Sequence, residues 1–236
     1  MGHASWKAVL FDAGNTLIHV DFERVAALLA EHGVPCDPPR LERAEHRARL
    51  RLDTAEVVSR TRDGERWWSY FNLICEDVGA ADAAVREKVL HRLRDHHRER
   101  NLWNRPAAGA IATLQALRSN GYRVGIISNS DGSIQELAEQ LGLAPLVEVI
   151  VDSHVVGVEK PDPRIFSIAL ERMGGLAAAE CLYVGDLYHV DVAGSGRAGL
   201  TPVLIDPAGL HADKTCMKIR ELGELIGIVK NGGEGF

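Results

Sequence analysis

Short, largely apolar runs alternate with amphipathic segments along most of the chain. Five of the runs fit strands that are buried on both faces of a parallel sheet. They lie at about 6–12, 123–127, 147–151, 181–184 and 202–205. Helical spacing predicts helices over 106–120, 133–141 and 163–173, each followed by glycine, a common residue after a helix C-terminus. Strands that alternate with helices predict an α/β fold with a doubly wound parallel sheet.

Residues 18–100 have a different pattern. Apolar side chains there fall on four stripes with helical spacing, separated by segments that contain glycine or proline. The stripes are Phe22-Val25-Ala26-Leu29, Leu41-Ala44-Ala48-Leu52, Trp67-Tyr70-Phe71-Ile74 and Val85-Val89-Leu93, and the breaks are Gly33-Val-Pro35, Asp37-Pro-Pro39, Arg62-Asp-Gly64 and Gly79. We therefore predict a bundle of about four helices, residues 18–100, inserted into an α/β core of residues 1–17 and 101–236. In the tail, Ile219, Leu222 and Leu225 have helical spacing and are expected to cover an edge of the core.

Composition narrows the class of protein. The formal net charge is −6, which argues against a nucleic-acid binder that relies on a basic surface. No apolar run approaches the ~20 residues of a membrane-spanning helix, and no signal peptide is recognised. The four scattered cysteines form no metal-binding pair. We expect a cytoplasmic protein with reduced thiols that binds neither nucleic acid nor membrane.

Four polar motifs lie at the C-terminal ends of predicted strands or in the loops that follow them. They are Asp12-Ala13-Gly14-Asn15-Thr16, Ser128-Asn129, Gly157-Val-Glu-Lys160-Pro161 and Gly185-Asp186-Leu-Tyr-His-Val-Asp191. The C-terminal ends of parallel strands are where open α/β sheets bind ligands. A carboxylate there can attack phosphorus, although an isolated Asp after a strand is more often a helix cap or turn residue. Asp12, Asp186 and Asp191 together would form an all-oxygen site that suits Mg²⁺.

In this order, the four motifs resemble those of the haloacid dehalogenase (HAD) superfamily, whose members are mostly phosphohydrolases with a Rossmann-like core. The resemblance implies that the inserted bundle is a type 1 cap domain. It implies catalytic roles for Asp12 and Lys160, and phosphate binding by Ser128, Asn129 and Lys160. The implied metal set for Mg²⁺ is Asp12, the backbone carbonyl of Gly14, Asp186 and Asp191. In that set, Asp191 is expected to orient a metal-bound water or Lys160 rather than to be a direct ligand.

Gly14 departs from the family pattern. The family's phosphatases usually carry an Asp at this position, and that Asp protonates the leaving group and then activates water. Its loss is expected to slow alkyl phosphates more than aryl or acyl phosphates, because general acid catalysis is worth about 10²–10⁴ in rate. Another residue can in principle supply the proton. The candidates near the motifs are His19, His154, Tyr188 and His189.

Three other functions remain open. Haloacid dehalogenases tend to carry Tyr at the position of Gly14 and need no metal, whereas this chain keeps Asp186. Phosphonatases use a cap lysine, and Lys88 is the only lysine of residues 18–100. A scaffold without its acid can also act as a phospho-ligand-binding protein. The main hypothesis is a Mg²⁺-dependent hydrolase of a small phosphorylated metabolite, acting through an aspartyl-phosphate as a monomer or homodimer.

The sequence of residues 18–100 does not identify the substrate. Trp67 and Trp68 are adjacent on one predicted helix, so at most one of them can lie in the bundle core. Trp68 can therefore face the substrate, although simple packing is the commoner role for such a residue. His96 and His97 lack metal-ligand spacing and are assigned to the surface.

Overall fold

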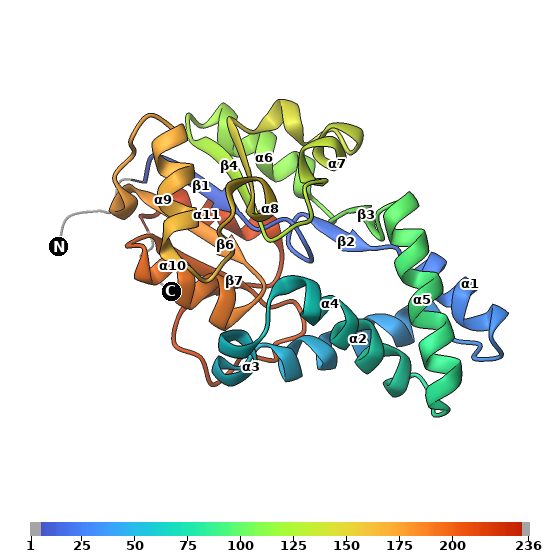
Figure 1. The fold of residues 1–236 in the computed structure, drawn as a ribbon. Coiled ribbons are helices and arrows are strands. Elements are labelled where there is room, and N and C mark those ends of the chain that lie inside the picture. Colours follow the sequence, from blue (N-terminus) through green and yellow to red (C-terminus); the bar gives the residue numbers. More distant parts are fainter. Residues whose placement is uncertain (1–5, 233–236) are drawn as a thin grey trace. The chain divides into compact units, whose positions relative to one another are not determined.

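A computed structural model describes residues 6–232, and the chain divides into two compact units (Figure 1). The α/β unit contains the chain up to His19 and again from Pro106 onward, and the helical unit, here called the cap unit, is Val20–Arg105. The chain crosses between the units within strands β2 (Ile18–Val20) and β3 (Trp103–Pro106), which pair as a two-stranded sheet. The sequence predicted an insertion of this kind, with boundaries a few residues earlier.

The core of the α/β unit is a six-stranded sheet in the order β5-β4-β1-β6-β7-β8. Every neighbouring pair is parallel. The strands are β1 (Ala8–Phe11), β4 (Arg123–Ser128), β5 (Val149–Asp152), β6 (Cys181–Gly185), β7 (Thr201–Ile205) and β8 (Met217–Ile219). The doubly wound α/β fold expected from the sequence is confirmed.

The strand order reverses around β1. From β1 the chain runs outward through β4 to β5, then returns to β6 on the other side of β1. Such a reversal opens a crevice at the C-terminal ends of the central strands, where doubly wound sheets bind ligands. Asp12 follows β1, Ser128 ends β4 and Asp186 follows β6, so three of the four motifs begin at this edge.

Helices cover the sheet. The elements are α6 (Ala110–Ser119), α7 (Ile134–Gln140), α8 (Ser153–Val156), α9 (Pro163–Arg172), the π-helical turn η3 (Tyr188–Val192), α10 (Ala193–Arg197) and α11 (Leu225–Lys230), with 3₁₀ turns at Ala144–Leu146, Ala178–Glu180 and Leu222–Glu224. Asp162 is the N-cap of helix α9, and its carboxylate accepts from the Arg164 N–H. Pro163 occupies the first position of the helix, where a missing N–H costs nothing. Its apolar face packs on Leu10, Ile127 and Tyr183 of the sheet.

Two predictions for the α/β unit are wrong in detail. Pro106 belongs to β3, and α6 begins only at Ala110, after Gly109 with φ of 76°. In the tail, Ile219 lies in β8, and only the segment after it is helical. In both places a short strand, β3 or β8, forms backbone hydrogen bonds to a neighbouring strand, and this pairing overrides a weak helical pattern.

The cap unit contains five helices among the described residues. They are α1 (Phe22–Glu31), α2 (Pro38–Leu52), α3 (Ala55–Arg60), α4 (Asp63–Asp77) and α5 (Ala83–Glu99). The residues of all four predicted stripes meet in one hydrophobic cluster. At its centre, Phe71 is fully buried and its ring lies 4.7 Å from Trp67 and 5.6 Å from Trp103.

The cap differs from the prediction at three places. Helix α3 is an additional short helix, capped by Thr54. Pro38 and Pro39, predicted to lie in a break between helices, form the start of α2 instead, since proline is tolerated in the first turn of a helix. His97 is buried rather than exposed: its Nδ1 accepts a hydrogen bond from the Leu102 N–H at 3.1 Å, and its ring lies beside Trp67 and Trp103. Within residues 6–232, no helix has the length and apolarity to cross a bilayer.

Candidate active site

Asp12 lies where β1 ends, in a tight turn. Its backbone N–H donates to the Val184 carbonyl at 2.8 Å, which continues the β1–β6 pairing by one residue. The N–H groups of Leu17 and Ile18 both donate to the Ala13 carbonyl at 2.9 Å and close the turn. Asn15 takes the left-handed φ of 55° that this turn requires, a conformation that Asn tolerates better than most residues. The buried carboxylate of Asp12 is therefore held at the sheet edge by its own backbone.

Lys160 brings the third motif to Asp12. Its side chain is 2% exposed, and its Nζ donates to Asp12 Oδ1 at 2.5 Å, to Asp191 Oδ1 at 2.8 Å and to Tyr183 Oη at 2.9 Å. An ammonium group has three N–H donors. All three therefore have a protein acceptor, and the motifs around Asp12, Lys160 and Asp191 form one connected cluster.

The backbone of Lys160 is fixed by Asn129. The Asn129 amide donates to the Lys160 carbonyl at 2.9 Å and accepts from the Lys160 N–H at 2.8 Å. This pair of bonds ties the loop after β4 to the loop that carries Lys160. The Asn129 side chain is thus engaged with the Lys160 backbone, and phosphate binding by Asn129 stays a prediction.

Ser128 is buried at the last position of β4, and its hydroxyl lies 3.4 Å from the Asn129 carbonyl oxygen. The loop that follows is anchored by the end of β5. Ser153 Oγ accepts from the Ser130 N–H at 3.1 Å, and the Asp152 carboxylate accepts from the Gly132 N–H at 3.1 Å. Sequence reasoning missed this anchoring pair, because nothing in the sequence indicates which loop Asp152 and Ser153 face.

Asp191 is oriented by both of its carboxylate oxygens. Oδ1 accepts from Lys160 and lies 3.2 Å from Tyr183 Oη, and Oδ2 accepts from the Leu187 N–H at 3.0 Å. Gly185 makes room for this carboxylate, since a Cβ at Gly185 would lie only 2.6 Å from Asp191 Oδ2. The bonds to Lys160 and Leu187 are compatible with the expected orienting role of Asp191, which stays a prediction.

Asp12, Asp186 and Asp191 can together hold a cation. Each is buried, and one carboxylate oxygen from each lies within 4.8 Å of the others. An all-oxygen set of this kind fits a hard divalent ion such as Mg²⁺, which binds through one or two carboxylates and keeps several waters. Gly14 follows Asp12 by two residues in the same turn and forms a bridge with Ile18. The residues present therefore fit the metal that the sequence implied.

Burial and charge shift the titration of this cluster. Burial raises the pKa of Asp12 to about 6, with Lys160 opposing the shift and Asp191 adding to it. Burial alone would lower the pKa of Lys160, but the carboxylates of Asp12 and Asp191 outweigh it and raise the pKa well above its usual value. Burial also raises the pKa of Tyr183, which stays a neutral phenol. The lysine is thus held as an ammonium beside a carboxylate that is easily protonated.

The four candidate proton donors lie on different elements. His19 is exposed in β2, and His154 is exposed in α8. Tyr188 and His189 are half-buried at the start of η3, two and three residues after Asp186, with their ring centroids 5.2 Å apart. Acid catalysis by any of them stays a prediction.

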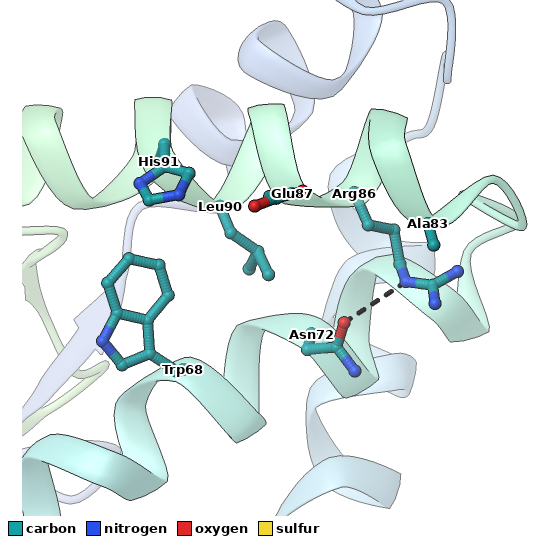
Figure 2. A pocket seen from close by; sticks show the side chains of 7 residues that line it. All are labelled: Trp68, Asn72, Ala83, Arg86, Glu87, Leu90 and His91. Atoms are coloured by element: carbon teal, nitrogen blue, oxygen red, sulfur yellow. Dashed lines mark hydrogen bonds between the residues drawn. The ribbon is translucent and has the colours of Figure 1, made fainter.

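The cap unit has a separate pocket of about 420 Å³ between α4 and α5 (Figure 2). Trp68 and His91 stand at one end with ring centroids 5.5 Å apart, and the hydrogen bond from Arg86 Nε to Asn72 Oδ1, 3.2 Å, lies at the other. Trp67 is buried in the bundle, whereas Trp68 is 36% exposed, as the alternation along the helix predicted. All seven residues that line the pocket belong to the cap unit.

Known proteins resemble this chain over between half and most of its length. A model of the haloacid dehalogenase-like hydrolases matches residues 6–199. Glyceraldehyde 3-phosphate phosphatase from Methanothermobacter thermautotrophicus is 30% identical over 215 residues, which cover 88% of this chain and 89% of that protein. Pyrimidine 5'-nucleotidase YjjG from Escherichia coli is 34% identical over 128 residues, 51% of this chain and 56% of that protein.

Solved structures have the same fold. The HAD-hydrolase YfnB from Bacillus subtilis aligns with a TM-score of 0.71 at 21% identity, over 95% of this chain and 98% of that one. An L-2-haloacid dehalogenase from Xanthobacter autotrophicus aligns with a TM-score of 0.60 at 20% identity, over 95% of this chain and 98% of that one. Since the family match runs from β1 to the end of α10 and includes all four motifs that meet at the sheet edge, this chain belongs to the haloacid dehalogenase-like hydrolases.

Proposed function

We propose that this enzyme is a Mg²⁺-dependent phosphohydrolase that acts on a small phosphorylated metabolite through an aspartyl-phosphate on Asp12. The observation that carries the proposal is the buried contact between Asp12 and Lys160, 2.5 Å, beside the carboxylates of Asp186 and Asp191. A nucleophile, a fixed cation and a metal set at one sheet edge are the groups that phosphoryl transfer requires.

The first step forms a bond between an Asp12 oxygen and phosphorus and breaks the bond from phosphorus to the leaving oxygen. The leaving oxygen keeps the electron pair and departs as an anion, or takes up a proton from water or another side chain. In the second step, water attacks the phosphorus of the aspartyl-phosphate, and inorganic phosphate and the Asp12 carboxylate are released. Lys160 and the loop of Ser128 and Asn129 bind the phosphoryl oxygens during both steps.

The metal set of the proposal is Asp12, Asp186 and the Gly14 carbonyl, with Asp191 orienting Lys160. Bound there, Mg²⁺ would offset the charge of the phosphoryl oxygens and help to align the attacking and leaving groups. Because the Gly14 ligand is a backbone oxygen, the absence of a side chain leaves it in place. The Asp12 carboxylate, the nucleophile itself, is then stabilised in its ionised form.

Gly14 limits the leaving group. With no acid at this position, the leaving oxygen must depart as an anion or take its proton from water or another side chain. Aryl and acyl phosphates tolerate this, because their leaving groups are weak bases, and alkyl phosphates tolerate it poorly. We therefore infer a preference for good leaving groups, although two relatives are named for glyceraldehyde 3-phosphate and pyrimidine 5'-nucleotides.

The test is a panel of aryl, acyl and alkyl phosphates, including sugar phosphates and nucleotides, assayed with Mg²⁺ and with a chelator. A 2-haloacid belongs in the panel as the dehalogenase alternative. We expect Asp12→Asn to lose at least about 10³-fold in kcat, because the nucleophile is removed. The matched control is Asp95→Asn, an exposed Asp on α5, which should retain full activity.

Two results would overturn the proposal. One is hydrolysis by Asp12→Asn at the rate of the parent enzyme, and the other is turnover of the 2-haloacid with no phosphate turned over. The proposal also includes a cytoplasmic location and a monomer or homodimer, which fractionation and sedimentation measure directly.

A further inference from the structure

Tyr183 is the part of the Lys160 cluster that the proposed function does not use. It is fully buried in β6, two residues before Gly185, and is the only hydroxyl in that strand. The Phe166 ring of α9 meets its ring edge-on, with centroids 4.9 Å apart. Its Oη lies 2.9 Å from Lys160 Nζ, 3.2 Å from Asp191 Oδ1 and 3.3 Å from the Ile127 carbonyl oxygen.

The direction of these bonds follows from the donors available. An ammonium can only donate, so Tyr183 Oη must accept from Lys160. The phenol proton then goes to Asp191 or to the Ile127 carbonyl, and both are acceptors. Tyr183 is thereby held at the ring by Phe166 and at the oxygen by Asp191 or the Ile127 carbonyl, which makes it a rigid acceptor for one Lys160 proton.

The three protons of Lys160 then have different fates in the reaction. The protons that go to Tyr183 and Asp191 point back into the protein. The third goes to Asp12 Oδ1, and Asp12 gives up its charge when it forms the bond to phosphorus. That third N–H is the one that can turn from the nucleophile to a phosphoryl oxygen while the other two hold the ammonium still.

We propose that Tyr183 is a positioning residue, which holds the Lys160 ammonium so that a single N–H is exchanged from Asp12 to the phosphoryl group in the transition state. The proposal rests on the phosphohydrolase function stated above. If Tyr183 only fills space in the core, the ring alone matters and the hydroxyl is dispensable. The two roles predict different results for the removal of one oxygen atom.

The experiment is Tyr183→Phe, assayed with an aryl phosphate that the parent enzyme hydrolyses in Mg²⁺. We expect kcat to fall by about tenfold with KM within about twofold, because a hydrogen bond to a charged group is lost at the step where Lys160 exchanges partners. Inhibition by orthovanadate, which mimics the five-coordinate transition state, should weaken by a similar factor. Inhibition by inorganic phosphate should change by less than about twofold.

The matched control is Tyr122→Phe, which removes a tyrosyl hydrogen bond to the Val229 carbonyl, 3.0 Å, in the same unit. It should leave kcat and both inhibition constants unchanged. If Tyr183→Phe keeps the parent kcat and vanadate inhibition, or weakens phosphate and vanadate equally, Tyr183 does not position Lys160. If Tyr183→Phe does not fold, 3-fluorotyrosine at position 183, a near-isosteric but weaker acceptor, takes its place, and an unchanged kcat then overturns the proposal.

The two proposals fail in different ways. A parent enzyme that turns over no phosphate contradicts the proposed function itself. A parent enzyme that is active while Tyr183→Phe is equally active contradicts only the role of Tyr183.

Discussion

Gly14 is the residue at which this chain departs from the usual phosphatases of its family. Its φ does not lie in the left-handed region, so the backbone does not demand glycine there. The turn is instead closed around Asn15, which carries the positive φ. The backbone conformation at position 14 therefore does not itself require glycine, and substitution by Asp tests whether the acid can be restored.

We predict that Gly14→Asp increases kcat/KM for alkyl phosphates by up to about 10²–10⁴-fold and for aryl phosphates much less, because only poor leaving groups need a proton. The measurement is the ratio of kcat/KM for an alkyl and an aryl phosphate in both proteins. Gly14→Asn is the matched control, since it has nearly the same shape and no titratable proton.

An equal gain with Asn would show that the side chain acts by packing and not as an acid. No gain with Asp would mean that another group, such as His189 or Tyr188, already supplies the proton.

A residue of the site was predictable from the sequence where the residues next to it form a recognisable motif. Asp12 and Asp186 follow apolar strands, and Lys160 precedes a proline, so each was recognised in its motif. Tyr183 was not recognised, since it reads as one more residue of an apolar strand. The available signal was a hydroxyl inside a run that is otherwise buried and apolar, because such a group must find a partner.

At the scale of elements, β6 and the turn η3 build half of the cluster. Side chains two apart on a strand share a face, so Tyr183 and Gly185 both face Asp191 of η3. In β6, Tyr183 supplies an acceptor for Lys160. Gly185, which has no side chain, leaves room for the Asp191 carboxylate. The Gly-Asp pair of the fourth motif thus has a packing reason as well as a chemical one.

We predict that Gly185→Ala reduces kcat by more than about tenfold and destabilises the protein by about 1–3 kcal/mol, the usual cost of overpacking a buried site. The added Cβ displaces the Asp191 carboxylate, and Lys160 loses one of its three acceptors. Urea unfolding gives the stability and steady-state assays give kcat.

The matched control is Gly196→Ala in α10, where a Cβ meets no atom within 4 Å. Its activity should be that of the parent, and its stability equal or slightly higher, since alanine favours a helix. A fully active Gly185→Ala would mean that Asp191 is not needed where the structure places it.

Elements were predictable where their pattern was long and regular. The central strands and helix α9 follow their sequence signals closely, and the four cap stripes meet in one cluster. Short elements were not predictable. Strand β8 is three residues long, and the spacing of Ile219, Leu222 and Leu225 fits a helix equally well until the edge of β7 offers backbone partners.

For the whole molecule, the proposed Mg²⁺ would link the carboxylate cluster to the stability of the fold. Asp12 has a raised pKa of about 6 without metal. The stability that it contributes is therefore fully present below the unfolded pKa, near 3.8, and is lost as the pH rises through about 6. Without a cation, the folded protein favours the protonated form of Asp12. A bound cation reverses this preference, because it binds the ionised carboxylate.

We predict that Mg²⁺ at 100 times its dissociation constant stabilises the protein by about 2.7 kcal/mol. Below pH 6 its affinity should fall about tenfold per pH unit, since Asp12 must lose a proton, and above pH 7 it should be nearly constant. Thermal unfolding with Mg²⁺ or a chelator, repeated between pH 5 and 8, measures both effects.

Asp186→Asn is the control that removes a proposed ligand but keeps Asp12, and its unfolding temperature should no longer respond to Mg²⁺. Equal stabilisation of Asp186→Asn and the parent would place the metal elsewhere. A Mg²⁺ affinity that does not change between pH 5 and 7 would exclude Asp12 as a ligand.

The sequence by itself determined the alternation of strands and helices, the inserted helical block and the polar residues that end the central strands. These properties are local, because period, capping and turn chemistry act over a few residues. Tertiary structure decided which groups touch: Lys160 reaches Asp12 across 148 positions of the chain, and Tyr183 across 23. Such contacts depend on the strand order and on the exact height of each residue at the sheet edge, and no local pattern encodes either.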